Sequence, residues 1–258
     1  MKMRESKVLN KLRAGKVVNC TKFNLLDPRV TEIAAMYGFD CLWLDKEHVP
    51  TDWVTVENQI RSAKIYDVDT MVRVARGSYS DYIQPLELDA AGIMVPHIMG
   101  LEDARKVVQM TRFYPIGRRP VDGGNADGSY TTLELKDYCS QANEQRFIVL
   151  QIEDPEPLDE LEAIAALEGY DMLFFGPGDF SQGIGALGDW NHPKLLEARQ
   201  RVAEVAIKHG KFAGTTATIN NLDEFIDLGY KFLSIGADVV GMNNYYSHLI
   251  TEFSNRIK

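Results

Sequence analysis

The sequence predicts a single (β/α)8 barrel, and three observations lead to this prediction. Eight short apolar runs, rich in β-branched and aromatic residues, recur along the 258 residues. Most of them lack polar–apolar alternation, which is typical of parallel strands buried on both faces. Longer amphipathic segments separate the runs, and no Pro/Ser-rich linker divides the chain. We therefore expect one barrel domain over residues 1–258, since barrels of about 250 residues are common.

The expected strands are the apolar runs Val17–Cys20, Cys41–Leu44, Thr70–Val74, Gly92–Val95, Phe147–Ile152, Met172–Phe175, Phe212–Thr215 and Phe232–Ile235. Between them, Pro28–Tyr37 has a helical apolar period and ends before Gly38, a residue that favours helix C-termini. Thr51 and Asp52 are N-cap candidates for a helix that continues to Ala63. Four further segments show apolar residues at i, i+3 and i+4: Leu101–Thr111, Leu158–Leu167, Pro193–His209 and Asn221–Leu228.

A doubly wound open sheet is the competing fold. It usually has a Gly-rich phosphate turn after its first strand, and Val17–Asn24 contains none. The longest irregular stretch is Tyr114–Tyr130. Because a loop of this length in a compact domain is usually functional or mobile, we expect this loop either to have a functional role or to be mobile.

Composition limits the possible partners and the compartment. The chain has 37 acidic and 28 basic residues, a formal net charge of −9, which disfavours nucleic acid and anionic membranes as partners. Cys20, Cys41 and Cys139 are odd in number and form no CxxC pair, which indicates reduced thiols. The charged N-terminal stretch lacks an apolar signal region, and no apolar run approaches the length of a membrane span. We expect a cytoplasmic protein.

Two carboxylates at predicted strand ends are candidate metal ligands. In a (β/α)8 barrel the active site lies at the C-terminal ends of the strands, and Glu153 and Asp179 follow neighbouring strands there. Two carboxylates without nearby lysines suit Mg²⁺ or Mn²⁺. The alternative is that Asp179 caps a short helix over 180–184 and that Glu153 is a surface carboxylate.

His48 and Arg73 are candidate catalytic residues. His48 follows the second strand with Asp45 and Glu47 beside it, the composition of a general base with an acidic partner. The alternative is a histidine that caps the helix starting near Thr51. Arg73 lies within an apolar strand, where a charge needs a partner. It suits a substrate carboxylate or a salt bridge to Glu47 or Glu153, and the two roles are compatible.

Taken together, these residues resemble the HpcH/HpaI aldolase family, the metal-dependent class II pyruvate aldolases. The resemblance covers roughly residues 7–240. The matching pieces are Gly38-Phe39-Asp40, Leu44-Asp45-Lys46-Glu47-His48, Val72-Arg73-Val74, Gly92-Ile93-Met94-Val95-Pro96-His97, Gln151-Ile152-Glu153, Phe175-Gly176-Pro177-Gly178-Asp179-Phe180-Ser181 and Gly210-Lys211-Phe212-Ala213-Gly214. The combination is specific, although no single piece is.

The resemblance implies roles for the metal and substrate residues. Glu153 and Asp179 would bind a divalent cation, Mg²⁺ or Mn²⁺, with Co²⁺ or Zn²⁺ as further candidates. Arg73 would hold the pyruvate carboxylate and stabilise the enolate. Gln151 would support the metal site, and the backbone N–H groups of Gly178 and Asp179 would meet the pyruvate carboxylate.

The resemblance also implies an acid/base residue, His48, with a carboxylate partner that lies before the fourth strand. Counting without a gap from Arg73 places Glu87 there, and a gap would place Asp89 there instead. We expect Glu87. Asp45 joins the catalytic set as the acidic neighbour of His48.

The implied reaction is retro-aldol cleavage of a 4-hydroxy-2-oxo acid, such as a 2-keto-3-deoxy sugar acid, to pyruvate and an aldehyde. The polar segment Val18–Asn24 departs from the Gly-Leu-Trp-like segment of many members, as does Arg119-Pro120 from their usual Arg-Gly, so the aldehyde is left open. Members are usually hexamers, and Met242–Ile257 is expected to pack on a neighbouring subunit or to be the last barrel helix.

Two other chemistries remain as alternatives. A Schiff-base aldolase needs a lysine inside the barrel, and Lys22 and Lys46 lie near strand ends. A CoA-thioester lyase of the citrate-lyase type would use the same metal–enolate core. It would also need a basic groove for the CoA phosphates, for which Arg112, Arg118 and Arg119 are the candidates.

Overall fold

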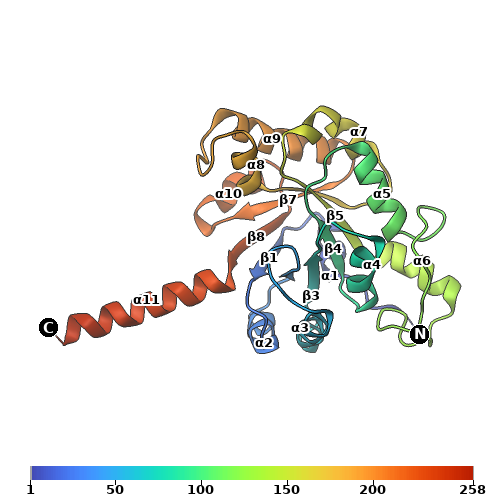
Figure 1. Ribbon diagram of the computed structural model, residues 1–258, viewed down its shortest axis with the longest axis horizontal. Coiled ribbons are helices and arrows are strands. Elements are labelled where there is room, and N and C mark those ends of the chain that lie inside the picture. Colours follow the sequence, from blue (N-terminus) through green and yellow to red (C-terminus); the bar gives the residue numbers. More distant parts are fainter. Residues whose placement is uncertain (1, 258) are drawn as a thin grey trace.

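Eight parallel strands form a closed barrel in the computed structural model, which describes residues 2–257 (Figure 1). Each strand pairs with the next, and β8 pairs with β1 to close the sheet. This closure confirms the predicted barrel and excludes the doubly wound sheet. The strands are β1 (Val18–Phe23), β2 (Cys41–Asp45), β3 (Asp69–Arg73), β4 (Gly92–Val95), β5 (Phe147–Ile152), β6 (Met172–Phe175), β7 (Phe212–Ala217) and β8 (Phe232–Ala237).

The chain has helices before, between and after the strands, and most of them surround the barrel. They are α1 (Lys7–Arg13), α2 (Pro28–Met36), α3 (Trp53–Ile65), α4 (Tyr79–Glu87), α5 (Leu101–Thr111), α6 (Leu135–Gln145), α7 (Leu161–Ala166), α8 (Pro177–Gly183), α9 (Pro193–Lys208), α10 (Leu222–Asp227) and α11 (Asp238–Arg256), with short 3₁₀ turns η1 (Glu156–Glu160) and η2 (Ile219–Asn221). The sequence analysis missed α1, α4 and α6. Helix α1 is short, α4 contains Pro85, and α6 is largely polar. For these reasons the helical period of apolar residues is weak in all three.

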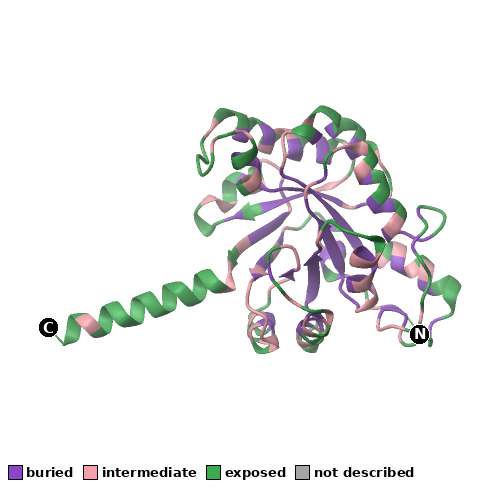
Figure 2. Cartoon of the chain, viewed as in Figure 1, coloured by how far each residue is buried: buried purple, intermediate pink, exposed green. Residues whose placement is uncertain are grey.

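Two apolar cores hold the barrel together. One lies between the strands and the outer helices, and the other fills the barrel interior. Val8, Leu9 and Leu12 of α1 belong to the interior core, so α1 closes the end of the barrel at which the strands begin. Figure 2 shows the buried strands inside the shell of partly exposed helices.

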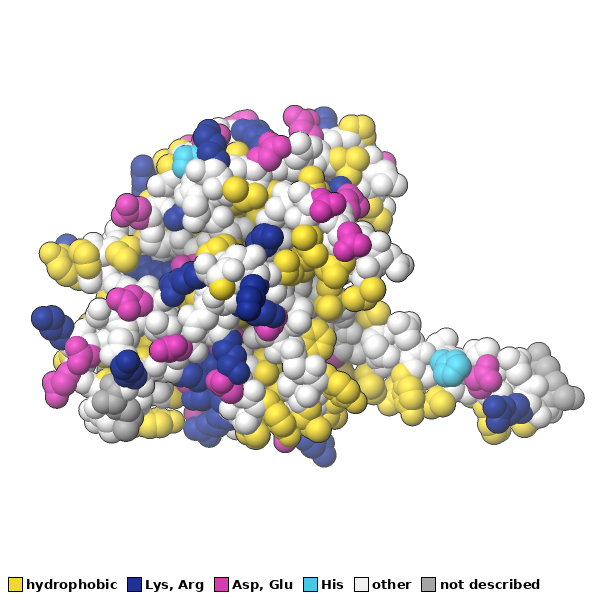
Figure 3. Space-filling model, turned by 180° about the vertical axis from the view of Figure 1, so that it is seen from behind, with side chains coloured by type: hydrophobic (Ala, Val, Ile, Leu, Met, Phe, Trp, Pro, Cys, Tyr) yellow, Lys and Arg dark blue, Asp and Glu magenta, His cyan; other side chains and the backbone are white. Residues whose placement is uncertain are grey.

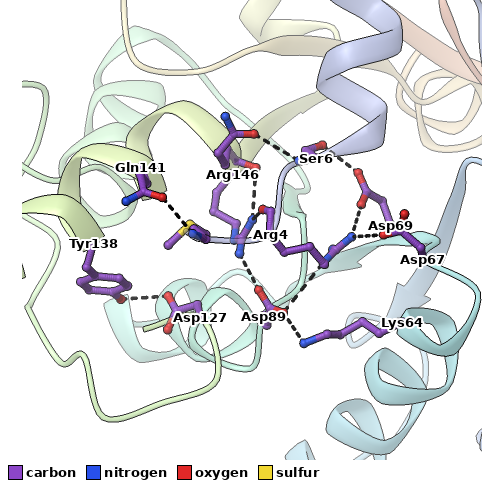
Figure 4. Close-up of polar contacts among 12 residues, drawn as sticks. Arg4, Ser6, Lys64, Asp67, Asp69, Asp89, Asp127, Tyr138, Gln141 and Arg146 are labelled. Carbon is purple, nitrogen blue, oxygen red and sulfur yellow. Dashed lines mark hydrogen bonds and ion pairs between the residues drawn. The ribbon is translucent and has the colours of Figure 1, made fainter. Parts of the chain in front are cut away.

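A buried polar network seals the same end (Figure 4). Asp69, the first residue of β3, accepts hydrogen bonds from the Ser6 hydroxyl at 2.7 Å and from the Val8 backbone N–H at 3.0 Å. Arg146 is fully buried and pairs with Asp89 at 2.5 Å. These contacts anchor the N-terminal segment beneath the barrel.

The C-terminal helix α11 leaves the barrel and projects from it, as Figure 1 shows. None of its residues is buried in this chain. Its direction is set at its first residue, where Asp238 accepts hydrogen bonds from the backbone N–H groups of Asn24 at 2.9 Å and Leu25 at 2.8 Å. Apolar side chains gather along the helix in Figure 3. Those with large exposed surfaces are Val240, Tyr245, Tyr246, Leu249, Ile250 and Phe253.

Among the helices of residues 2–257, none combines the length and the apolar character that crossing a membrane requires.

The buried Arg146–Asp89 pair gives a prediction about stability. Replacing Arg146 by Met leaves Asp89 without its closest buried cation, so we expect the free energy of unfolding to fall by about 3 kcal/mol or more. Arg105→Met is the control, because Arg105 is exposed, and it should change stability by less than about 0.5 kcal/mol. Urea unfolding of both variants measures the difference. Equal stabilities would show that the pair does not hold this end together.

Candidate active site

A cavity of about 340 Å³ lies at the C-terminal ends of the strands. The side chains that line it come from strands on all sides of the barrel and from the loops that follow them. They include Lys22, Trp43, Arg73, Gln151, Glu153, Phe174, Asp179, Trp190, Thr216 and Ser234. Because α1 fills the other end of the barrel, this cavity is where polar groups from separate strands meet.

Arg73 and Asp45 form a buried ion pair at the cavity floor. Arg73 donates from Nε at 3.1 Å and from Nη2 at 2.6 Å to the two oxygens of Asp45, a bidentate arrangement. The third guanidinium nitrogen, Nη1, lies 3.0 Å from Glu47. Burial opposes the charge of Asp45, but the hydrogen bonds from Arg73 outweigh it and lower the pKa of Asp45 to about 2. Both groups are therefore charged at neutral pH.

Lys22 shares the same carboxylate. Its Nζ lies 2.9 Å from Asp45 Oδ2 and 5.6 Å from the centre of the Trp43 ring. Arg73 lies over the same ring at 4.8 Å. Both cations thus contact the same carboxylate and the same indole ring, and the lysine is engaged in an ion pair.

Glu153 is buried beside Gln151, which donates a hydrogen bond to it, and it also accepts from the His97 backbone N–H at 2.9 Å. Gly176 is the residue that permits this packing. A Cβ there would lie 2.6 Å from a Glu153 oxygen and 2.9 Å from the Gln151 amide nitrogen. Burial raises the pKa of Glu153 to about 7, and the nearby charges of Asp179 and Glu47 add to the rise.

These groups fit a divalent cation. One donor atom each from His97, Glu153 and Asp179 lies within 4.8 Å of the others. The Gln151 carbonyl oxygen beside them is buried and has no hydrogen-bond partner among the described residues. A buried carboxylate with a raised pKa, Glu153, together with an unpaired buried acceptor, forms the kind of environment that a cation stabilises.

The alternative roles considered for these carboxylates, a helix cap for Asp179 and a surface position for Glu153, are both wrong. Helix α8 starts at Pro177 with Gly176 as its N-cap, so Asp179 lies in the first turn and does not cap a helix over 180–184. Gly178 lies beside it in that turn and lines the cavity. Glu153 is not a surface carboxylate, since its side chain is 1% exposed.

His48 lies at the rim of the site, with its side chain 57% exposed. Its Nε2 is 3.5 Å from a Glu47 oxygen, so Glu47, not Asp45, is the carboxylate beside it. The helix after it is capped by Asp52, which accepts from the Thr55 N–H, so His48 is not the cap.

The expected partner of His48 is not at the site within this chain. Glu87 ends α4, which leads into the start of β4, whereas His48 follows the end of β2, so the two residues lie toward opposite ends of the barrel. Burial raises the pKa of Glu87, and the charge of Arg119 opposes that rise in part. Asp89 lies in the buried network with Arg146 and a short contact to Lys64. In residues 2–257, neither carboxylate contacts His48.

His97 is a site residue to which the sequence analysis assigned no role. Its Nδ1 lies 2.8 Å from Asp154, and its Nε2 lies 3.6 Å from Glu47. In the sequence, the indication that His97 belongs to the site was its position just past the end of the fourth strand. Its backbone φ of 50°, which turns the side chain toward the site, has no mark in the sequence.

Two of the three arginines considered for binding the phosphates of CoA are buried in ion pairs. Arg112 is buried, pairs with Asp171 at 2.5 Å and bonds to backbone carbonyls. Arg119 is buried and pairs with Asp127 at 3.0 Å. The structure therefore weakens the citrate-lyase alternative.

Comparisons with known proteins agree with this geometry. A family model described as HpcH/HpaI aldolase/citrate lyase matches residues 23–244. A 5-keto-4-deoxy-D-glucarate aldolase of Klebsiella pneumoniae is 33% identical over 216 residues, 83% of this chain and 84% of that protein. A hydroxypyruvate/pyruvate aldolase of Pseudomonas aeruginosa is 33% identical over 233 residues, 88% of this chain and 85% of that protein. The structure of an HpcH/HpaI aldolase/citrate lyase family protein from Burkholderia cenocepacia superposes with a TM-score of 0.89 at 28% identity, over 96% of this chain and 99% of that one.

Proposed function

Since this chain belongs to the HpcH/HpaI aldolase/citrate lyase family, we propose that it cleaves a 4-hydroxy-2-oxo acid, a 2-keto-3-deoxy sugar acid, to pyruvate and an aldehyde, and catalyses the reverse condensation. The aldolase names of its relatives support a carbon–carbon lyase. One observation carries the proposal. A buried arginine, Arg73, faces the same cavity as two carboxylates, Glu153 and Asp179, that suit a cation.

Arg73 binds the 2-oxo acid and stabilises the enolate. Asp45 and Glu47 fix the guanidinium, so it does not need to reorganise when negative charge develops beside it. A preorganised cation in a partly desolvated site stabilises such charge more than water does. The Gln151 amide and the backbone N–H groups of Gly178 and Asp179 complete the binding of the pyruvate carboxylate.

Glu153 and Asp179 would hold the divalent cation, with the His97 ring as a third donor group. Mg²⁺ and Mn²⁺ suit the oxygen ligands, and the imidazole also admits Co²⁺ or Zn²⁺. When bound, the cation supplies a Lewis acid to the keto group of the substrate.

His48 acts as the acid/base residue in this proposal. In the cleavage direction it takes the proton of the C4 hydroxyl, and the C3–C4 bond then breaks to release the aldehyde. Glu47 lies beside His48, with one of its oxygens 3.5 Å from His48 Nε2. His97 is the runner-up for this role, because it contacts the same Glu47 carboxylate and lies nearer to Glu153.

The subunit arrangement and location complete the proposal. We propose one barrel domain in a homo-oligomer, a hexamer, in which α11 packs its apolar face on a neighbouring subunit. A stripe of apolar side chains along α11 is left in solvent, which is costly, and a second copy would cover it. The cytoplasm suits Cys20, Cys41 and Cys139, which are free thiols.

Proton exchange at the pyruvate methyl group tests the core reaction. Proton NMR in D2O follows the loss of the methyl signal with Mn²⁺ or Mg²⁺, after EDTA treatment, and in Arg73→Ala. We expect exchange with metal, none after EDTA, and a loss of about a hundredfold or more in Arg73→Ala. Arg76→Ala is the control, since Arg76 pairs with Asp103 at an exposed site. Exchange that survives EDTA would favour a Schiff base, and no exchange at all would contradict the proposal.

Two histidine variants identify the acid/base residue. We expect His48→Asn to lower kcat for cleavage by about a hundredfold or more while cation affinity, measured by calorimetry, stays unchanged. His97→Asn should instead weaken cation binding. If His97→Asn loses kcat at saturating metal and His48→Asn does not, the roles are reversed.

The apolar face of α11 gives a prediction about assembly. Leu249→Glu combined with Phe253→Glu places charges on that face, and sedimentation should show a smaller species than the wild type. Asn244→Glu with Thr251→Glu adds the same charge on the other side of the helix and should leave the assembly intact. A monomeric wild type at micromolar concentration would contradict the proposed oligomer.

A further inference from the structure

We propose that Trp43 is a positioning residue for Arg73, and that its indole ring keeps the guanidinium in the orientation in which it receives the pyruvate carboxylate. This inference rests on the proposed aldol reaction, in which Arg73 binds the 2-oxo acid. It assigns a role to an aromatic side chain that the reaction steps above leave unused.

Neighbouring strands bring the indole ring and the guanidinium together. Trp43 and Asp45 both belong to β2, and Asp45 pairs in register with Arg73 of β3. Because successive side chains on a strand point to opposite faces, Trp43 and Asp45 point to the same face of the sheet. The Cζ atom of Arg73 lies over the Trp43 ring at 4.8 Å from its centre, within the range of a cation–π interaction. Both residues line the cavity.

The carboxylates restrain the guanidinium of Arg73 in its own plane. Nε and Nη2 donate to Asp45, and Nη1 lies 3.0 Å from Glu47. A guanidinium has five N–H donors, all in that plane, so two remain for a ligand after these three contacts. A ring over the cation limits the tilt of the plane. The ring therefore holds the direction of the two remaining donors.

Further aromatic rings hold Trp43 itself. Phe174 of β6 meets it edge to face, with ring centres 5.6 Å apart and an angle of 78° between the planes. Phe232 of β8 meets Phe174 in the same way at 6.3 Å. The three rings belong to the core that fills the barrel interior, and Trp43 is 3% exposed. Trp43 is thus a fixed support for the arginine beside it.

The indole N–H group of Trp43 supplies the conservative variant for a test. It is buried and has no hydrogen-bond partner in the part of the chain that the structure describes. An unpaired buried donor lowers stability, so Trp43→Phe keeps a ring beside Arg73 and removes that cost. Trp43→Leu removes the ring. Trp43→Met, with its flexible apolar side chain, takes the place of Trp43→Leu if that variant does not fold.

Exchange of the pyruvate methyl protons at saturating metal tests the role of Trp43. We expect Trp43→Leu to lower kcat/KM for exchange by about tenfold, and Trp43→Phe to retain most of the wild-type value. Cation affinity, measured by calorimetry, should stay unchanged in both variants, because Trp43 offers no ligand atom to a metal. In an Arg73→Ala background, Trp43→Leu should change exchange by less than about twofold, because no guanidinium remains to be held.

Phe225→Leu is the matched control. The Arg199 guanidinium lies over the Phe225 ring at the same 4.8 Å, and Tyr230 meets that ring edge to face at 5.7 Å. Among the described residues, Phe225 is not one of those that line the catalytic cavity. We expect Phe225→Leu to lower stability in urea, as Trp43→Leu does, and to leave pyruvate exchange unchanged.

The outcomes distinguish this inference from the function on which it rests. Unchanged exchange in Trp43→Leu, with exchange intact in wild type and lost in Arg73→Ala, would overturn the role of Trp43 and leave the aldolase proposal standing. An equal loss in Trp43→Phe and Trp43→Leu, or a tenfold loss that persists in the Arg73→Ala background, would overturn it as well, because neither fits a ring that acts through Arg73. Absence of pyruvate exchange in the wild type would remove both proposals.

Discussion

Closure of the sheet between β1 and β8 is the constraint on which the site depends. A closed parallel barrel brings every strand end to one ring, so residues far apart in sequence, such as Lys22 and Glu153, line one cavity. An open sheet of the same strands would leave the first and last of them apart. A register shift lies at the same place, between Cys20 and Lys22 in the pairing of β1 with β8.

The buried arginine in that ring has carboxylate counterparts. Arg73 is nearly inaccessible to water, and a guanidinium in that position is stable only with carboxylates on its donors. Asp45 and Glu47 supply them. Glu153 lies on the other side of the ring, where burial raises its pKa to about 7 and the charges of Asp179 and Glu47 add to the rise. One half of the ring is therefore balanced by the chain itself, and the other half is suited to a bound metal.

The barrel, and the meeting of Arg73, Glu153 and Asp179 at one cavity, could be predicted from the sequence for a physical reason. Strands buried on both faces read as continuous apolar runs, and a charge such as Arg73 inside one run, or Glu153 just after another, stands out. Those residues meet because the fold brings strand ends together. The same reasoning does not extend to helices whose apolar period is weak, such as α4.

The remaining site features depend on contacts that sequence distance does not encode. Glu87 was placed beside His48 by counting residues, yet counting does not say at which end of the barrel a helix ends. His97 reaches the site through a left-handed backbone conformation. The sharing of Asp45 between Arg73 and Lys22 depends on the order of strands around the ring and on side-chain reach.

The packing of α1 beneath the strands affects the order in which reactants bind and products leave. Because that helix and the polar network around Asp69 fill one end of the barrel, molecules reach the cavity from the opposite end. Entry and exit then share a path. Whichever of the two reactants lies deeper must arrive first and leave last, so the architecture itself imposes an order on binding and release.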